Sequence, residues 1–258
     1  MKLDPEEPFL KVSIVTAVYN RESVIAHAVQ SVRAQGYRNL EHVIIDGAST
    51  DGTLATIQSC VDQRAVVFSE PDKGIYDALN KGFARATGDI VGIVHSDDFL
   101  ADDRVLADIV QAFADAEVDA VYGDLDYVSQ DDDSHVVRHW SAGRFDRRQL
   151  HWGWMPPHPT LFIRRSAIDR LGAFDTGYRI SADYDLVLRY FCRGEVRPAY
   201  IPRVLVKMRV GGASNRSLQQ MWLKSSEDWR ALRRNRVGAF GGVGALIWKN
   251  LRKVRQFL

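Results

Sequence analysis

The fold is decided near the start of the chain, by residues 12–46: VSIVTAVYNRESVIAHAVQSVRAQGYRNLEHVIID. Val12 to Val18 is a mostly apolar run, typical of a buried strand. Glu22 to Gln35 has the spacing of a helix, and Leu40 to Asp46 is a second apolar run that ends in a carboxylate. A strand, a helix and a strand in this order indicate the α/β class.

Strands and helices continue to alternate up to residue 122. We expect further strands at Val66–Ser69, Ile90–His95 and Val118–Tyr122, and helices from about Asp51, over Gly74–Ala86 and over Asp103–Ala114. This alternation predicts a mostly parallel sheet that helices cover on both faces. In such sheets, ligands bind outside the carboxyl ends of the strands.

Residues 123–258 follow a different pattern. The elements expected there are a strand pair over Gly123–Trp140, an aromatic, proline-marked loop at 152–157, a strand at Thr160–Arg164, a helix over Ser181–Cys192, an extended stretch at Tyr200–Val210 and a helix over Ser217–Arg236. The sequence has no internal repeat and no long linker, so we expect one compact domain with a basic tail.

The composition is that of an ordinary folded protein. The 258 residues are 46% hydrophobic and 26% charged, and the formal net charge of +1 gives no reason to expect a nucleic-acid partner. No run reaches the roughly 18 apolar residues of a membrane span, and acids and a proline stand where a signal peptide would be apolar. Cys60 and Cys192 lack metal-ligand spacing. We expect a soluble or peripheral protein of the reducing cytoplasm.

Polar side chains follow the first four expected strands at the points where the strands end. These residues are Tyr19, Asn20, Asp46, Asp72, Lys73, Asp97 and Asp98. Because the carboxyl ends of parallel strands meet at one edge of a sheet, we expect these residues to gather there.

Asp97 and Asp98 stand side by side at the end of an apolar strand. Two carboxylates at such a point are costly unless water or a cation neutralises them. Hard cations such as Mg²⁺ and Mn²⁺ take oxygen ligands and commonly bridge a carboxylate to a diphosphate. A polar turn that caps the next helix is the alternative, because Asp102 and Asp103 follow closely.

Residues 72–82, DKGIYDALNKG, place Gly74 at the start of a helix, where free backbone amides favour an anionic group. Asp77, Asn80 and Lys81 share a face of this helix, and for the helix taken alone an exposed Asp77–Lys81 ion pair worth a few tenths of a kcal/mol is the favoured explanation. Asp46 has no such structural explanation, and its carboxylate is suited to accept hydrogen bonds from a base or a ribose.

Asp183 lies at the start of the helix expected over Ser181–Cys192. With Ser181 as the N-cap, Asp183 falls in the first turn, where the helix dipole favours a carboxylate by about 0.3–1 kcal/mol. Asp183 also shares a face with the apolar stripe that turns inward, whereas Asp185 points elsewhere. A carboxylate in that position is suited to act as a base in a cleft.

Seven segments carry a family resemblance when they are taken in order. They are SIVTAVYN (13–20), VIIDGASTDGT (43–53), DKGIYDALNKG (72–82), ATGDIVGIVHSDD (86–98), HPTLFIRR (158–165), GAFDTGYRISADYDL (172–186) and MRVGGAS (208–214). In this order they resemble the family 2 glycosyltransferases with the GT-A fold, especially the bacterial branch that builds colanic-acid-type polysaccharides and glycolipids. The resemblance implies a GT-A domain over 1–214, with a nucleotide-sugar-binding half at 1–122 and an acceptor and catalytic half at 123–214. Residues 215–258 would be a helical, basic extension.

The resemblance also implies roles for particular residues. The donor would be bound by Thr16, Tyr19, Asn20, Asp46, Asp72, Lys73, Asn80 and Asp97. Asp97 and Asp98 match the motif for a divalent cation, Mg²⁺ or Mn²⁺, and Asp183 matches the general base. The residues expected near the acceptor are His158, Trp152 and Trp154.

The chain departs from the family pattern at three places. His95 stands where relatives often have asparagine, and Leu79 where many have arginine, which leaves Lys73 or Lys81 as the cation for the diphosphate. The segment MRVGGAS lacks the histidine that many relatives have near it, and Arg209 is the residue there that could contact phosphate instead.

The implied reaction is a single displacement at the anomeric carbon. Asp183 would take a proton from a hydroxyl of a saccharide or lipid-linked acceptor, the leaving group would be a nucleoside diphosphate (UDP or GDP by resemblance), and the configuration would invert. A glycoside hydrolase also uses paired carboxylates, but it needs neither a nucleotide site nor a metal. A nucleotidyltransferase would bring a glycine-rich, basic phosphate loop, which the sequence lacks. A catalytically inactive binding module of the same fold stays as the alternative.

Residues 243–258 interleave apolar side chains with Lys249, Arg252, Lys253 and Arg255. This pattern suits a helix at an anionic membrane surface, which would hold the protein at the inner face of the plasma membrane. A terminal helix packed on the domain explains the pattern equally well.

Overall fold

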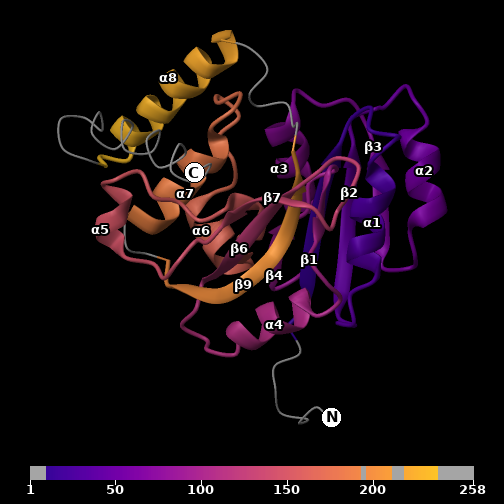
Figure 1. Ribbon diagram of the computed structural model, residues 1–258, viewed down its shortest axis with the longest axis horizontal. Coiled ribbons are helices and arrows are strands. Elements are labelled where there is room, and N and C mark those ends of the chain that lie inside the picture. The colour runs from indigo at the N-terminus through magenta and orange to yellow at the C-terminus, as the bar shows by residue number, and fades with distance from the viewer. Residues whose placement is uncertain (1–9, 193–195, 211–217, 238–258) are drawn as a thin grey trace.

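The computed structural model describes residues 10–192, 196–210 and 218–237. In this part of the chain, nine strands form one sheet between two layers of helices (Figure 1). The strands are β1 Val12–Val18, β2 Leu40–Asp46, β3 Ala65–Ser69, β4 Ile90–Ile93, β5 Asp98–Leu100, β6 Ala120–Val128, β7 Val136–Trp140, β8 Phe162–Arg164 and β9 Pro198–Arg209. The helices are α1 Ile25–Arg33, α2 Thr53–Cys60, α3 Ile75–Arg85, α4 Val105–Ala112, α5 Arg147–Leu150, α6 Arg165–Leu171, α7 Ala182–Cys192 and α8 Leu218–Arg234, with a 3-10 turn, η1, at His158–Thr160.

The first half of the sheet is parallel, which confirms the prediction from the alternating pattern. β1 pairs in parallel with β2 and β4, and β2 pairs in parallel with β3. The register aligns Val18 with Asp46 and Asp46 with Ser69, so β1, β2 and β3 end on one line across the sheet. The polar residues that follow these strands are therefore brought to a single edge.

The second half of the sheet is mixed. β8 runs antiparallel to β4 and β6, and β9 runs parallel to β6 but antiparallel to β5. The order is β3-β2-β1-β4-β8-β6-β9-β5, with β7 beside β6. The antiparallel pair β6–β7 confirms the strand pair expected over Gly123–Trp140.

Strand β1 is buried on both faces, which explains its nearly continuous apolar run. Ile14 belongs to a hydrophobic cluster shared with α1, α2 and α4, and Val15 belongs to a second cluster shared with α3, α6 and α7. Helix α3 lies very close to the sheet at Gly82, because a Cβ added there would overlap the Val15 side chain. This close packing fixes where the N-terminus of α3 meets the edge of the sheet.

The sequence pattern does not predict β5, α5 or α6, which are all short. β5 forms because Asp98–Leu100 pairs with β9, more than 100 residues later in the chain. Asp98 is thus part of the sheet and does not cap α4: that helix begins at Val105, and it is Asp102 that accepts the Arg104 N–H, at 2.9 Å. β8 begins two residues later than expected, because His158–Thr160 forms η1.

Helix α8 packs against α7 at the top of the view in Figure 1. None of the helices in the described residues is long and apolar enough to span a membrane. Residues 243–258, for which the sequence suggests a membrane-surface or packed helix, lie outside the described residues.

Candidate functional site

The loops that follow β1, β2 and β3 are tied together by hydrogen bonds at the sheet edge. Asp46, the last residue of β2, is fully buried and accepts hydrogen bonds from Ser49 Oγ at 2.5 Å and Ser69 Oγ at 2.6 Å. Its carboxylate therefore organises the protein's own loops. For Asp46 to contact a base or a ribose as predicted, some of these hydrogen bonds would be replaced by hydrogen bonds from the nucleoside.

Tyr19, Asn20 and Asp72 surround Gly47. Asn20, whose φ is 50°, donates its backbone N–H to Ser49 Oγ at 2.9 Å and so joins the loops after β1 and β2. A Cβ on Gly47 would overlap the Asp72 carboxylate and contact the Tyr19 ring, so this glycine allows the three loops to meet. Tyr19 is 55% exposed and presents an aromatic ring at this edge. The structure brings these three predicted donor residues together.

The N-terminus of α3 lies beside Asp72. Gly74 has a φ of 116°, and its N–H donates to the Asp72 carboxylate at 2.8 Å. The ion pair between Asp77 and Lys81, which the sequence left as an alternative, is present at 3.4 Å. Lys81 is thus engaged within its own helix, whereas Lys73 is exposed.

Two residues predicted to contact the donor are used inside the protein. Thr16 is fully buried; its hydroxyl donates to the Val94 carbonyl at 2.8 Å and lies 2.9 Å from His42 Nε2. Asn80 donates to the Phe174 carbonyl at 2.9 Å and accepts from the Phe174 N–H at 3.0 Å. Thr16 thus holds the sheet interior and Asn80 joins α3 to the segment before α7, and their contact with the donor stays a prediction.

Asp98 is a buried carboxylate without a partner. It is 1% exposed, and neither of its oxygens has a hydrogen-bond partner within the residues that the structure describes. Burial raises the pKa of Asp98 well above its usual value, and the charge of Asp97 adds to the rise. A divalent cation would relieve both effects, so Asp97 and Asp98 fit an Mg²⁺ or Mn²⁺ ion.

Two imidazoles lie between the paired aspartates and Asp183. The rings of His95 and His158 meet edge to face, with their centroids 5.5 Å apart, and His158 Nδ1 lies 3.2 Å from Asp183 Oδ2. Burial, together with the charge of His158, lowers the pKa of His95 to about 4. His95 is therefore neutral at pH 7. The structure brings His158, predicted to lie near the acceptor, against the predicted base.

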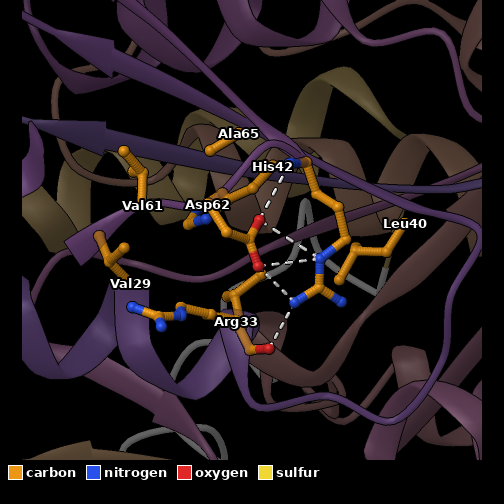
Figure 2. Close-up of a pocket in the computed structure, with 9 residues that line it drawn as sticks. Val29, Arg33, Leu40, His42, Val61, Asp62 and Ala65 are labelled. Carbon is orange, nitrogen blue, oxygen red and sulfur yellow. Dashed lines mark hydrogen bonds and ion pairs between the residues drawn. The ribbon is translucent and has the colours of Figure 1, made fainter.

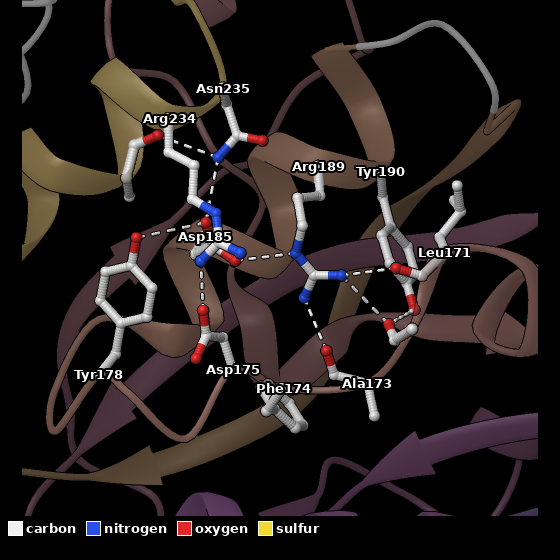
Figure 3. Close-up of polar contacts among 12 residues, drawn as sticks. Leu171, Ala173, Phe174, Asp175, Tyr178, Asp185, Arg189, Tyr190, Arg234 and Asn235 are labelled. Atoms are coloured by element: carbon white, nitrogen blue, oxygen red, sulfur yellow. Dashed lines mark hydrogen bonds and ion pairs between the residues drawn. The ribbon is translucent and has the colours of Figure 1, made fainter.

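Asp183 and Asp185 share the first turn of α7 but lie in different surroundings. Asp185 is fully buried and is held by Arg189 Nε at 2.8 Å and Asn235 Nδ2 at 3.1 Å (Figure 3). Arg189 also donates to the backbone carbonyls of residues 171–173. Asp183 faces His158 instead, with its side chain 17% exposed. Asp183 shares a face with the apolar stripe, as expected, but Asp185 is the more buried of the two aspartates.

An apolar pocket adjoins Asp183 and His158 and holds about 370 Å³ of empty space, its mouth included. Its remaining lining residues are Phe83, Val91, Ile93, Leu161, Ile163, Phe174, Leu186 and Val187. Leu186 and Val187 belong to the inward stripe of α7 that the sequence predicts. Asp183 therefore has the polar His158 on one side and the apolar pocket on the other.

The aromatic loop contributes one exposed ring and one core ring. Trp152 is 56% exposed, as an acceptor-side residue should be. Trp154 is 6% exposed, its indole N–H donates to the Ala142 carbonyl at 3.0 Å, and its ring packs edge-on to Tyr122. Trp154 is part of the hydrophobic core, so its predicted place near the acceptor stays a prediction.

A second hollow lies at the opposite end of the strands (Figure 2). Its walls include Leu40 and Ala65, the first residues of β2 and β3. Arg64 pairs there with Asp62 at 2.7 Å and donates to the Arg33 carbonyl at 2.5 Å. The polar groups of this hollow bind one another, so we assign them to the internal structure.

Sequence reasoning does not identify Tyr76 and Glu227, which both hold the segment before α7. Tyr76 Oη donates to the Ile180 carbonyl at 2.6 Å, and Glu227 accepts backbone N–H groups from the same segment. Neither residue has a local signal, because each bonds to backbone more than 40 residues away.

Arg209, suggested as a phosphate contact, is held by Asp133 at 2.9 Å.

Comparison with known proteins identifies the family. Residues 13–172 match the model described as glycosyl transferase family 2. The chain belongs to this family. The matched region includes the strand-end residues and the Asp97–Asp98 pair, but it ends before Asp183.

Curated relatives of this glycosyltransferase cover most of its length. An uncharacterized glycosyltransferase of Mycobacterium tuberculosis is 34% identical over 181 residues, which are 69% of this chain and 68% of the relative. A PGL/p-HBAD biosynthesis glycosyltransferase of Mycobacterium bovis is 30% identical over 221 residues, 82% of each chain. The chain is therefore an enzyme of sugar transfer.

Solved structures show that this glycosyltransferase has the GT-A fold. S. aureus TarS 1–349 in complex with UDP-GlcNAc superposes with a TM-score of 0.66 at 15% identity, covering 88% of this chain and 65% of that chain. The mannosyltransferase PcManGT from Pyrobaculum calidifontis, in complex with GDP-Man and Mn²⁺, gives 0.65 at 20% identity, covering 93% and 69%. The chain spans 39% of the longer TarS chain.

Proposed function

We propose that this enzyme is an inverting glycosyltransferase. It moves the sugar of a UDP- or GDP-sugar donor to a hydroxyl of a saccharide or lipid-linked acceptor. The observation that carries the proposal is a series of neighbouring groups from Asp97 through His95 and His158 to Asp183, which lies beside a pocket. Asp98, next to Asp97 in the chain, adds a buried carboxylate whose oxygens have no hydrogen-bond partner among the described residues. The ligands of TarS and PcManGT support the choice of donor.

The donor would bind along the edge where β1, β2 and β3 end. The exposed Tyr19 ring offers a stacking surface for the base, and Asp72 and Asn20 offer hydrogen-bonding groups beside it. The N-terminus of α3 and the exposed Lys73 favour the negative charge of the diphosphate.

Asp97 and Asp98 would hold a divalent cation. When bound, such an ion supplies Lewis-acid stabilisation of the charge that develops on the departing nucleoside diphosphate. Within the described ranges, no group of three or more His, Cys, Asp or Glu side chains is close enough to form a metal cage. The two aspartates would therefore share the ion with diphosphate and water oxygens.

Asp183 would accept the proton of the attacking acceptor hydroxyl, a role that typically accelerates a reaction by about 10²–10⁴-fold. His158, at 3.2 Å, orients the carboxylate, which lies at the edge of the apolar pocket. We assign one base and no covalent nucleophile, which gives a single displacement with inversion. Exposed Trp152 offers a ring on which an acceptor sugar can stack.

We place the reaction in the cytoplasm, at the inner face of the plasma membrane when the acceptor is lipid-linked. This location rests on residues 243–258, whose apolar and basic pattern suits an anionic surface. Co-sedimentation with anionic vesicles, compared between the full chain and a chain that ends at Gly241, is expected to show weaker binding by the shorter protein. Equal binding would contradict the membrane role.

A thermal-shift screen of UDP-, GDP-, dTDP- and CMP-sugars, with and without Mn²⁺, tests the donor site. We expect one nucleotide class to raise the melting temperature in a metal-dependent way, and the rise to be lost in Asp98→Ala. Glu117→Gln is the control, because Glu117 is exposed and pairs with Arg197. The absence of a shift with every donor, at concentrations far above a plausible Kd, would favour an inactive binding module or another ligand.

A further inference from the structure

We propose that Glu227 is a positioning residue that fixes the general base Asp183 through the backbone just before α7. The inference rests on the proposed function, since it gives meaning to the place of Asp183. Glu227 lies in α8, outside the region that matches the family model.

One buried carboxylate gathers three consecutive backbone donors. Glu227 is 5% exposed, and it accepts the N–H groups of Arg179 at 2.9 Å, Ile180 at 2.9 Å and Ser181 at 3.0 Å. Hydrogen bonds to an ionised acceptor are roughly twice as strong as neutral ones, and burial strengthens them further. Residues 179–181 are therefore held as one rigid unit.

This unit leads directly into the turn that carries the base. Ser181 immediately precedes α7, and Asp183 is the second residue of that helix. The Ser181 carbonyl accepts the Asp185 N–H at 3.0 Å, so the clamped segment and the first turn of α7 are continuous. A displacement of residues 179–181 would move Asp183 relative to His158.

The rest of α8 holds the neighbouring residues. Arg230 donates to the Gly177 carbonyl at 2.7 Å and stacks on the Tyr178 ring, with its guanidinium carbon 3.9 Å from the centroid. Asn235, one residue beyond α8, donates to Asp185 at 3.1 Å (Figure 3). Helix α8 and the residue after it thus contact the segment from Gly177 to Asp185 through Glu227, Arg230 and Asn235.

Helix α3 holds the same segment from the donor side. Tyr76 donates to the Ile180 carbonyl at 2.6 Å, and Glu227 accepts the Ile180 N–H. Both backbone polar groups of Ile180 are therefore hydrogen bonded. A base must be held within about 0.5 Å of its productive place, and a misplacement of about 1 Å can cost about 10²-fold in rate. The double restraint at Ile180 meets that requirement.

A double-mutant cycle of Glu227→Gln and Asp183→Asn tests the inference. Glutamine has nearly the same shape, but its NH₂ group would face a backbone donor and break part of the clamp. We expect Glu227→Gln to lower kcat by about 10–100-fold, leave the Kd for the donor unchanged, and have no further effect in the Asp183→Asn background. Hydrogen exchange over residues 179–185 should quicken in Glu227→Gln.

Two further variants keep the test interpretable. Ser226→Ala changes the adjacent, exposed residue of α8 and should leave kcat unchanged. Glu227→Asp keeps the charge but withdraws it by one methylene, so it should fold readily and show an intermediate loss of kcat.

The outcomes separate the inference from the proposed function. If Glu227→Gln lowers the rate by the same factor in both backgrounds, as loss of folded enzyme would, the positioning role is overturned. If Asp183→Asn is as active as the unchanged enzyme, the proposed base is overturned instead. If the unchanged enzyme transfers no sugar from any donor, both are overturned.

Discussion

Asp98 and Asp97 are neighbours in the sequence but lie in different surroundings. Asp97 is half-buried, whereas Asp98 is 1% exposed and its oxygens have no hydrogen-bond partner among the described residues. A buried carboxylate of this kind destabilises the protein on its own and becomes favourable when a cation binds. The Asp98 carboxylate therefore lowers the stability of the metal-free protein but is needed for the proposed binding of the cation.

Asp98→Asn should stabilise the metal-free protein and abolish metal-dependent donor binding. The amide removes a buried charge without changing the shape, a gain of about 1–2 kcal/mol. In a protein of this size that gain raises Tm by roughly 2–4 °C per kcal/mol, which scanning fluorimetry in EDTA can measure. Asp97→Asn removes only the repulsion between the two carboxylates and should give a smaller rise. A lower Tm in Asp98→Asn would contradict this description of Asp98.

Trp152 and Trp154 provide a second test at the residue scale. Trp154→Ala removes a core ring and should cost about 3–5 kcal/mol of stability in urea unfolding. Trp152→Ala should change stability by less than about 0.5 kcal/mol and raise the KM for the acceptor. A KM effect confined to Trp154→Ala would show that the acceptor binds elsewhere.

The sequence predicts which residues end the parallel strands, and the structure gathers Tyr19, Asn20 and Asp72 as expected. It cannot predict that Thr16 is buried. Strand β1 has apolar residues on both faces, so it shows no polar–apolar alternation. Without that alternation, the sequence does not show which face of the strand Thr16 occupies. Trp154 is obscure for a similar reason, because only the distant Tyr122 and Ala142 show that its ring is internal.

Among the elements, α3 packs against the sheet through a close contact at Gly82. Gly82 faces Val15 so closely that any Cβ would overlap it, and the same helix directs its N-terminus to the proposed diphosphate site. The position of the sheet edge relative to α3 therefore depends on this contact.

Gly82→Ala should destabilise the protein by about 1–3 kcal/mol through overpacking, despite the better helix propensity of alanine. It should also weaken donor binding, because α3 must move away from β1. Urea unfolding and calorimetric titration with the donor measure the two effects. Ala84→Val, on the exposed side of α3, is the control and should cost less than about 0.7 kcal/mol. Equal effects of the two substitutions would contradict the close packing.

Apart from β5, the elements of residues 12–122 are predictable because each strand is an apolar run of its own and each helix has helical spacing. The mixed half of the sheet is not, because β5 pairs with β9 and β8 lies between β4 and β6. Such pairings depend on residues far apart in the chain, and a three-residue strand has no period to recognise. The same limit hides Glu227, whose partners precede it by more than 40 residues.

At the scale of the whole molecule, buried imidazoles make stability depend on pH. Burial lowers the pKa of His42 to about 3, from 6.5 in the unfolded chain. A group whose folded pKa is depressed contributes stability above its unfolded pKa, and this is lost as pH falls from about 6.5 towards about 3. The Thr16 hydroxyl donates its hydrogen to the Val94 carbonyl, so it can only accept a hydrogen bond from His42 Nε2. This contact requires the tautomer of His42 that carries its hydrogen on Nε2.

His42→Gln should make unfolding less sensitive to acid. Glutamine can still donate to Thr16, but it takes up no proton when the chain unfolds. Urea unfolding at a series of pH values from 7.5 to 5 should show a smaller loss of stability in the variant than in the unchanged protein. A parallel loss in both would mean that His42 does not contribute to acid sensitivity.

The central claim is that Asp183 acts as the base of an inverting sugar transfer. The most direct test is time-resolved proton NMR of an α-linked UDP- or GDP-sugar, with water as the acceptor and enzyme in excess, so that cleavage outpaces mutarotation. We predict metal-dependent release of the nucleoside diphosphate with the β-anomer of the sugar appearing first, and a rate at least about 10²-fold lower in Asp183→Asn. First appearance of the α-anomer, or an unchanged rate in Asp183→Asn, would contradict the claim.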